Sequence, residues 1–391
     1  MKAVICQNAE LSVVDLPEPV PGPGQVLVEV LRCGICGSDL HLRHHCDHMK
    51  ELVTRIGGGD LFPSSSDKVV FGHEFSCSVL EYGPDCKRTL KPGTHVVSQP
   101  VIRHGKEIDT TGLSNRANGA YAERMILQES LLIPVPNGLS AEMAALTEPM
   151  AVGWHAVRRS EIKKRDVAIV IGCGPVGLAV ICGLKARGVR TVIASDFSSG
   201  RRKLAQECGA DVVINPAVTS PYANWEEFGF FMEQPALLKF AVGTREKLNK
   251  LPLSWWHVWR MAEAIGGPPA RPIIFECVGV PGVVQQIIDG APLMSRVVVV
   301  GVCMQVDRYE PALAVMKEID LRFVINHSPL EYRDTVHMIA HGTLNCAPLL
   351  TGEVGLAGVD NAFTALKDPE IHAKILINPK SLATEPVAVA R

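Results

Sequence analysis

Four short segments in the first 150 residues supply cysteine, histidine or acidic residues. The four segments are residues 33–41 (CGICGSDLH), 72–74 (GHE), 118–123 (NGAYAE) and 147–149 (TEP). One sulfur, one imidazole and one carboxylate, with no cysteine nearby as a fourth ligand, are typical of a catalytic zinc site. Such a site keeps one coordination position open. Cys33 and Cys36 also fit one half of a structural zinc knuckle, but the chain has no second CxxC motif.

A glycine-rich turn in the middle of the chain fits a dinucleotide-binding site. Residues 172–177 (GCGPVG) follow the apolar run 167–171 and open a helical segment. In this pattern Gly172 permits a tight turn, Gly174 lets the backbone approach a pyrophosphate, and Gly177 lets helix and strand pack closely. The pyrophosphate would lie at the helix N-terminus, where unpaired N–H groups favour anions.

The next acidic residue indicates which dinucleotide binds. Asp196 ends the following apolar run, 19 positions after Gly177. Its carboxylate should accept hydrogen bonds from the adenosine ribose hydroxyls and repel a 2′-phosphate, so the sequence favours NAD over NADP. Arg201 and Arg202 follow closely and keep NADP open as the alternative. Asp196 also fits a plain structural role as the N-cap of a helix over residues 198–204.

Two different sheet patterns must position these residues. Up to residue 150, short apolar runs such as residues 25–31 lie between proline and glycine turn signals and predict a β-rich barrel or sandwich. From residue 151, helical segments separate apolar runs of strand length, which predicts a parallel α/β sheet. These runs are residues 167–171, 191–195, 211–215, 273–277 and 296–300. Near the C-terminus, residues 374–378 (KILIN) suggest a strand that joins the first domain.

Residues 167–184 carry no charge over eighteen positions, the minimum length of a membrane span. Their four glycines and Pro175 favour a strand, a turn and a helix instead. The net charge of −2 argues against a partner such as nucleic acid or an anionic membrane bound through bulk charge. Twelve cysteines in 391 residues are too few for a disulfide scaffold, and residues 1–11 lack the apolar run of a signal peptide. We therefore expect reduced thiols and a cytoplasmic location.

Two segments are longer than their neighbours require. Residues 216–272 form a 57-residue crossover that contains Trp225, Trp255, Trp256 and Trp259, with Trp255, Val258, Trp259 and Ala262 on one helical face. We expect this insert to pack on the dinucleotide domain, with a subunit contact and a membrane contact as the alternatives. The segment between Cys36 and His73 contains His44, His45, Cys46 and His48. It predicts a polar lid or solvated turn over the substrate cleft, and a second metal site is the alternative.

The motifs together resemble those of the zinc-dependent medium-chain alcohol dehydrogenases over nearly the whole chain. They are CGICGSD-LH, GHE, KPG, NGAYAE, EP-AVGWHA, GCGPVG, IASD, ECVG and GVC. The EP form of the last zinc motif is similar to the polyol, threonine and butanediol branch, in which a glutamate replaces a cysteine ligand. The resemblance implies an α/β protein with a β-rich GroES-like catalytic domain (residues 1–152 and 326–391). A doubly wound Rossmann domain would occupy residues 153–325, with the insert at about 217–271.

The resemblance also implies roles for single residues. Cys36, His73 and Glu148 would bind zinc, and Glu74 would be a neighbouring carboxylate that binds directly or through water. Ser38 would supply the hydroxyl of a proton relay and His41 its outer histidine. The NAD contacts would be Gly172, Gly174, Pro175, Val176, Gly177, Asp196, Arg201, Val278 and Val302.

The expected reaction is reversible hydride transfer between an alcohol and NAD, and the resemblance favours a secondary alcohol. Zinc acts as a Lewis acid towards the alcohol or carbonyl oxygen. Residues 98–119 contain no cysteine, so we expect one catalytic zinc per chain and no structural zinc. The family forms homodimers and homotetramers. Two other functions remain open: a zinc-free quinone or enone reductase, which would normally lack these ligands and prefer NADPH, and a non-catalytic nucleotide-binding protein.

Overall fold

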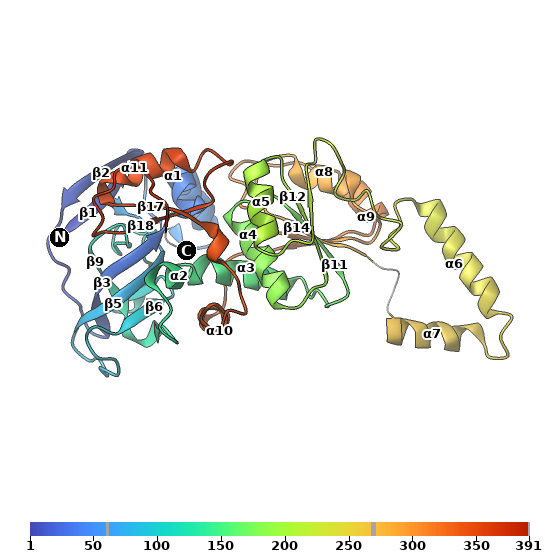
Figure 1. The fold of residues 1–391 in the computed structure, drawn as a ribbon, viewed down its shortest axis with the longest axis horizontal. Coiled ribbons are helices and arrows are strands. Elements are labelled where there is room, and N and C mark those ends of the chain that lie inside the picture. The colour runs from blue at the N-terminus through green and yellow to red at the C-terminus, as the bar shows by residue number, and fades with distance from the viewer. Residues whose placement is uncertain (60–61, 267–270, 390–391) are drawn as a thin grey trace.

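The computed structural model describes residues 1–59, 62–266 and 271–389. Two sheet-based bodies lie side by side, and a pair of helices extends from one end (Figure 1). One body is rich in antiparallel strands and the other contains a parallel sheet flanked by helices. The predicted α/β fold class is therefore confirmed. No helix in the described ranges has both the length and the apolar character needed to cross a bilayer.

A seven-stranded sheet forms the first body. Its order is β10–β6–β5–β3–β18–β17, and β9 pairs with β3. The strands are β3 (Gln25–Gly34), β5 (Glu74–Tyr82), β6 (His95–Ser98), β9 (Arg124–Gln128), β10 (Leu132–Pro134), β17 (Leu350–Val354) and β18 (Lys374–Ile377). Strand β18 runs antiparallel to β3, with Leu376 opposite Gly34. The C-terminal strand thus joins the N-terminal sheet, as KILIN suggests, while the exact domain boundaries stay predictions.

Two smaller sheets complete this body. Strand β1 (Lys2–Gln7) lies between β2 (Glu10–Asp15) and β4 (Val69–Val70). Strands β7 (Val101–His104) and β8 (Glu107–Thr110) form a hairpin within the cysteine-free segment 98–119. The buried Asp109 carboxylate accepts hydrogen bonds from Ser114 and from Arg116, whose Nη2 lies 3.0 Å away. This polar cluster stabilises the lobe around the hairpin.

The second body contains a six-stranded sheet in which every pairing is parallel. Its order, β13–β12–β11–β14–β15–β16, is that of a doubly wound dinucleotide-binding fold. The strands are β11 (Val167–Ile171), β12 (Thr191–Ser195), β13 (Val212–Ile214), β14 (Ile273–Glu276), β15 (Arg296–Val299) and β16 (Asp320–Phe323). The uncharged stretch 167–184 forms β11 and most of α4 (Pro175–Ala186), so it is a strand, a turn and a helix as expected.

Helices cover the sheets and connect the bodies. They are α2 (Ala141–Ala145), α3 (Thr147–Arg159), α5 (Ser199–Glu207), α8 (Val283–Gly290), α9 (Pro311–Met316), α10 (Pro329–Ala340) and α11 (Val359–Ala365). Short 3₁₀ turns lie at Glu129–Leu131, Ala347–Leu349 and Leu356–Gly358. Buried side chains of α3 and α4 share one core with strands of the parallel sheet, among them Val157, Leu178 and Val170. The chain thus passes from the first body into the second along a packed helix.

The segment between Cys36 and His73 differs from the expectation of a lid or turn. Residues 37–55 form helix α1 (Gly37–Arg55), kinked at His45. Asp39, Leu42 and Cys46 are its buried residues, at spacings that place them on one face. Cys46 donates to the carbonyl of Pro63, and His44 and His45 are exposed. These side chains therefore serve packing and solvent contact, and among the described residues they form no metal-binding group.

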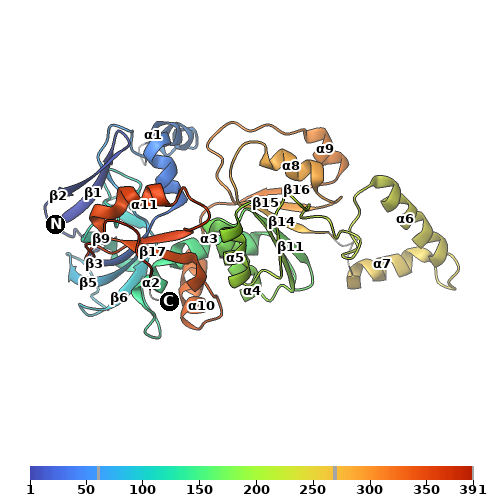
Figure 2. The same cartoon turned by 45° about the horizontal axis from the view of Figure 1, so that its top comes forward.

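The aromatic insert divides into two parts. Tyr222 and Phe230 are buried against the parallel sheet together with Ile169 and Ile274, as the packing expectation requires. Helices α6 (Gln234–Leu248) and α7 (Trp255–Gly266) instead extend away from the body (Figures 1 and 2). The expectation of packing on the dinucleotide domain is thus correct for the beginning of the insert and wrong for its helical part.

Candidate active site

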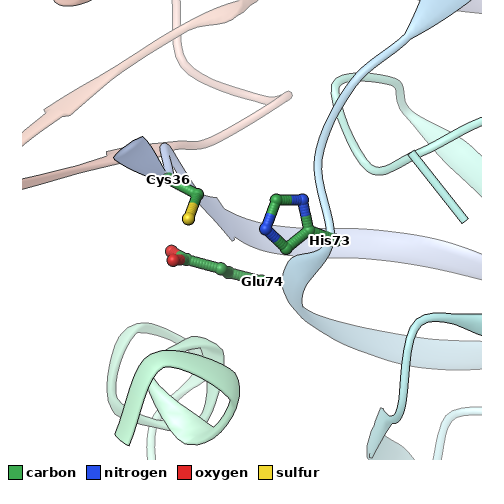
Figure 3. Close-up of side chains that lie close together, drawn as sticks. All are labelled: Cys36, His73 and Glu74. Carbon is green, nitrogen blue, oxygen red and sulfur yellow. The ribbon is translucent and has the colours of Figure 1, made fainter. Parts of the chain in front are cut away.

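Cys36, His73 and Glu74 converge at one end of the first sheet (Figure 3). One ligand atom from each lies within 4.8 Å of the others, and this is the one group of its kind in the described part of the chain. Cys36 precedes the first turn of α1, and Glu74 begins β5 directly after His73. Sulfur, imidazole and carboxylate from two distant segments therefore face one small volume.

Gly72 explains how His73 reaches this position. Its φ of +104° lies in the left-handed region that favours glycine. A Cβ at residue 72 would lie 2.6 Å from Tyr121 Cδ1 and 2.8 Å from Cys33 Sγ. The chain can therefore turn into β5 at this point only without a side chain. This explains why the first residue of the GHE motif is glycine.

Asp39 orients both sulfur and imidazole, although the sequence analysis gave it no role. Its Oδ2 accepts hydrogen bonds from the Cys36 backbone N–H (3.0 Å) and from the Tyr121 hydroxyl (2.8 Å). Its Oδ1 lies 3.5 Å from His73 Nδ1. Burial opposes a charge on His73, but Asp39 and Cys36 outweigh it and raise the His73 pKa well above its usual value. A carboxylate beside a ligand imidazole fixes the ring and increases its basicity.

Glu74 forms a buried ion pair that sequence reasoning missed. Lys374 Nζ lies 2.7 and 2.8 Å from the two carboxylate oxygens, and both side chains are 1% exposed. Burial opposes the charge on Lys374, but Glu74 and Cys36 outweigh it and raise the Lys374 pKa. The residues are 300 positions apart, and only a lone lysine in the apolar KILIN run signalled the contact.

Replacing Lys374 with methionine should destabilise the metal-free protein by about 3–5 kcal/mol. The change leaves the Glu74 carboxylate buried without a cation, and breaking a buried ion pair from one side has this typical cost. Urea unfolding of metal-free protein measures the loss. The double variant Lys374→Met/Glu74→Gln removes both charges and should recover most of the stability. A single variant as stable as wild type would contradict the importance of the pair.

Glu148 lies close to the group but outside it. It belongs to the first turn of α3, where the helix dipole favours a negative charge. Its Oε1 lies 3.6 Å from Nε2 of His327, another residue that the sequence did not single out. Burial opposes ionisation of Glu148, but His327 and His73 outweigh it and lower the Glu148 pKa. Glu148 is therefore a nearby carboxylate, and its role as a ligand stays a prediction.

The donor set fits a zinc ion. Burial and the neighbouring Glu74 raise the pKa of the Cys36 thiol, so a thiolate here requires a compensating cation. His73 Nδ1 lies 3.5 Å from the Asp39 carboxylate, which leaves Nε2 as the ring nitrogen that would bind the ion. Sulfur, imidazole and carboxylate are the ligands that zinc takes in catalytic sites. Cys36, His73 and either Glu148 or Glu74 are the residues that would hold the ion.

The two residues predicted for proton transfer lie on α1. Ser38 Oγ is 3.3 Å from His73 Nε2, so its hydroxyl adjoins the donor set. His41 follows three positions later and is exposed. Burial of part of its ring, together with His45, lowers the His41 pKa. Ser38 thus joins the site, whereas no contact places His41 beside the donors.

The glycine-rich loop has the expected geometry after β11. Gly172 has a φ of +88°, and a Cβ at Gly177 would overlap the Gly172 carbonyl. A Cβ at Gly174 would have only Arg201 Cζ within contact range, at 4.0 Å. Gly172 and Gly177 therefore serve the turn and the packing, and Gly174 leaves the space that a pyrophosphate needs. Pro175 begins α4 and is followed by Val176.

Asp196 and Arg201 lie beside this loop. The Asp196 carboxylate accepts hydrogen bonds from the backbone N–H groups of Cys173 (2.7 Å) and Ser198 (2.8 Å). Arg201 Nε is buried without a hydrogen-bond partner in the described ranges. Ser198, and not Asp196, caps α5 by accepting from Arg201 N. The N-cap alternative for Asp196 is thus wrong.

Val278 and Val302 follow β14 and β15. Their side chains are 43% and 49% exposed. The buried Glu276 carboxylate holds the loop after β14 by accepting from the N–H groups of Val278 and Gly279. Both valines therefore lie at the carboxyl ends of the parallel strands, where ligands bind in open α/β sheets.

The chain is similar to several known proteins. The family model "Alcohol dehydrogenase GroES-like domain" matches residues 22–137, and "Zinc-binding dehydrogenase" matches residues 175–251. An (R,R)-butanediol dehydrogenase of Bacillus subtilis is 29% identical, over 97% of this chain and 100% of the relative. A sorbitol dehydrogenase of Gallus gallus is 26% identical, over 95% and 94%. The crystal structure of 2R,3R-butanediol dehydrogenase from Bacillus subtilis has a TM-score of 0.72 at 28% identity and covers 97% of this chain and 99% of its own.

Proposed function

This chain belongs to the zinc-dependent medium-chain alcohol dehydrogenases, and from that premise we propose that it oxidises a secondary alcohol to a ketone, reversibly, with NAD. Alcohol oxidation and the use of zinc and a nicotinamide cofactor follow from the family. The choice of NAD, one zinc ion per chain without a structural zinc, and a secondary alcohol are proposals. The group of Cys36, His73 and Glu74, of which the last two are buried, is the observation that carries the proposal.

We propose Cys36, His73 and Glu148 as the zinc ligands. Lys374 already neutralises Glu74 through both carboxylate oxygens, which leaves Glu148 the better third ligand and Glu74 a neighbour. When bound, zinc supplies Lewis-acid polarisation of the alcohol or carbonyl oxygen. Asp39 holds the His73 ring, and the Lys374 pair holds Glu74 in place.

Ser38 and His41 would move the proton of the alcohol. The Ser38 hydroxyl adjoins His73 and would accept the proton of the alcohol while releasing its own towards His41. His41 lies one helical turn further along α1 and is exposed, so it would release the proton to solvent. Its lowered pKa keeps the ring neutral, and able to accept a proton, at neutral pH.

The pyrophosphate would lie against Gly174 and Arg201, and the adenosine ribose against Asp196. Val278 and Val302 would line the part of the cofactor site that takes the nicotinamide ring, at the carboxyl ends of β14 and β15. Among the described residues, Arg201 alone brings an atom within 4.0 Å of a Cβ built at Gly174, which supports a role in binding phosphate. The Asp196 carboxylate beside the ribose would disfavour a 2′-phosphate.

Replacing Asp196 with asparagine should raise the ratio of kcat/KM with NADP to kcat/KM with NAD by about tenfold or more. The change removes a negative charge that would face the 2′-phosphate, and like charges at close range cost more than the 1.4 kcal/mol that a factor of ten represents. Initial rates with both cofactors measure the ratio. Asp166→Asn, a partly exposed aspartate just before β11 in the same body, is the control. An unchanged ratio in Asp196→Asn would contradict the ribose role.

The substrate is proposed to carry a hydroxyl on a secondary carbon, as in a vicinal diol or polyol. Relatives are named butanediol and sorbitol dehydrogenases. Gly37 directly follows Cys36, and a Cβ at this position would meet nothing within 4 Å, so open space adjoins the donor set. That space suits a branched carbon next to the reacting one.

A panel of alcohols tests the substrate proposal. Reduction of NAD is followed with butane-2,3-diol stereoisomers, sorbitol, a simple secondary alcohol, a primary alcohol and a cyclic alcohol, with quinone reduction by NADPH as the counter-assay. We expect turnover with the secondary alcohols and diols and its loss with a zinc chelator. Chelator-resistant quinone reduction without alcohol oxidation would instead identify a zinc-free reductase.

The protein is also proposed to act as a homodimer or homotetramer in a reducing, cytoplasmic environment. Closed symmetric assemblies are the commonest oligomers. All twelve cysteines are free thiols, which fits a compartment that keeps thiols reduced.

A further inference from the structure

A loop of the first body contacts the beginning of α5 in the second body. Residues 366–373 connect α11 to β18, and Glu370 in this loop lies against Ser199 and Gly200. A Cβ at Gly200 would overlap the Glu370 carbonyl oxygen. The two bodies therefore meet so closely that the second residue of α5 has to be glycine.

The Glu370 carboxylate binds the first turn of α5 as a free anion would. Its Oε2 accepts hydrogen bonds from the Ser199 hydroxyl (2.7 Å) and the Gly200 N–H (2.8 Å), and its Oε1 accepts from the Ser199 N–H (3.1 Å). Unpaired N–H groups at a helix N-terminus favour a negative charge. The hydrogen bonds from Ser199 and Gly200 lower the Glu370 pKa to about 2, so the carboxylate is charged at neutral pH. Three donors that could bind a phosphate are thus occupied by a side chain of the first body.

These donors lie beside the residue proposed to bind the adenosine ribose. Asp196 directly follows β12, three positions before Ser199, and its Oδ1 accepts a hydrogen bond from the Ser198 N–H (2.8 Å). Asp196 and the first turn of α5 therefore belong to one short connection. In dinucleotide-binding folds the acidic residue at this place binds the ribose 2′-hydroxyl, so a 2′-phosphate would lie near this turn.

Other donors near Asp196 are also bonded to the protein. Ser198 Oγ donates to the Pro369 carbonyl (2.9 Å), and Arg202 Nη1 donates to the backbone carbonyl of Asp196 (2.8 Å). Arg201 is the residue proposed above for the pyrophosphate. The Ser198 hydroxyl and one nitrogen of Arg202 are thus engaged in holding the turn and the neighbouring loop.

We propose that Glu370 determines cofactor specificity, because its carboxylate occupies the N–H groups and the hydroxyl that a 2′-phosphate would need. The proposal rests on the choice of NAD proposed above and adds to Asp196 a second residue, from the other body, that enforces it. The carboxylates of Asp196 and Glu370 would both repel a 2′-phosphate, whereas the 2′-hydroxyl of NAD is uncharged.

Calorimetric titration with NAD and NADP tests this role without any reaction, because no alcohol is present. The two cofactors differ only in the 2′-phosphate, so the ratio of the NADP dissociation constant to the NAD dissociation constant isolates that group. Glu370→Ala frees three donors and removes a negative charge. The ratio should fall by about tenfold or more, because charge-assisted hydrogen bonds to phosphate are stronger than neutral ones. The double variant Asp196→Asn/Glu370→Ala should have a lower ratio than either single variant.

Two further variants make the comparison specific. Glu370→Gln removes the charge but keeps the length of the side chain, so it should lower the ratio less than Glu370→Ala does. Glu385→Ala is the matched control, because Glu385 is also an exposed glutamate of the first body and accepts a hydrogen bond from Asn361 Nδ2 (2.8 Å). It should leave the ratio unchanged. Circular dichroism checks that each variant is folded.

The outcomes separate the role of Glu370 from the choice of NAD. If wild type prefers NAD and both Glu370 variants keep its ratio, the role of Glu370 is overturned while the choice of NAD stands. If Glu370→Ala weakens both cofactors equally, Glu370 only joins the two bodies, which also overturns the proposal. If wild type binds NADP at least as tightly as NAD, both proposals fail.

Discussion

The Cys36→Ala variant is expected to lose bound zinc and alcohol oxidation together. Cys36 supplies the only sulfur of the donor group, and its thiolate would compensate the charge of the ion. Changes in residues that merely orient zinc ligands cost roughly 10–100-fold in metal affinity or activity, so removing a ligand should cost more. Metal content by mass spectrometry and initial rates of NADH formation measure both losses on one preparation.

Cys86→Ala provides the control for this variant. It also removes a thiol, but from a loop of the first body that lies outside the donor group. It should keep zinc and turnover. If Cys36→Ala contains no metal and still turns over at the wild-type rate, zinc has no role in the reaction.

The Ser38→Ala variant is expected to keep its zinc and lose turnover by about 10²–10⁴-fold, the usual contribution of a positioned proton-transfer group. Ser38 Oγ lies 3.3 Å from His73 Nε2 without belonging to the donor group, so removing the hydroxyl leaves all proposed ligands in place. The loss should appear in kcat, with zinc content unchanged.

Ser38→Thr serves as the conservative partner of this variant, because it retains the hydroxyl and should recover much of the rate. Loss of zinc in Ser38→Ala would show that Ser38 acts through the site's structure. Full turnover in Ser38→Ala would show that the hydroxyl takes no part in proton transfer.

Local patterns predicted the dinucleotide domain well because its chemistry is contiguous. Gly172, Gly174 and Gly177 lie on one turn between a strand and a helix, and each has a backbone reason to be glycine that can be read from spacing alone. The alternating apolar runs likewise required a parallel sheet. The order of the strands was not predicted, because it depends on pairings that the structure shows.

The residue types of the donor group Cys36, His73 and Glu74 were predicted from the sequence, but the residues that support them were not. Asp39 was inside a quoted motif, yet its bonds to Tyr121 and Cys36 depend on how two segments meet. Lys374 reaches Glu74 across 300 positions, and no local periodicity records such a contact. An unpaired lysine in an apolar strand was the available signal, because a buried charge needs a partner.

The helical segments show a different limit. Asp39, Leu42 and Cys46 recur at helical spacing, so α1 was readable, but the histidines and glycines around them suggested a loop. In the insert, the shared face of Trp255, Val258 and Trp259 predicted a helix correctly. Its direction away from the body depends on tertiary contacts that an amphipathic pattern does not specify.

Removal and return of zinc on the wild-type protein test the central claim most directly. The protein is stripped with a chelator and titrated with zinc while NAD reduction by the best secondary alcohol of the panel is followed. We predict negligible turnover without metal and a linear recovery that ends at one zinc per chain. Full alcohol-dependent turnover in protein shown to be free of zinc and other metals would contradict the claim.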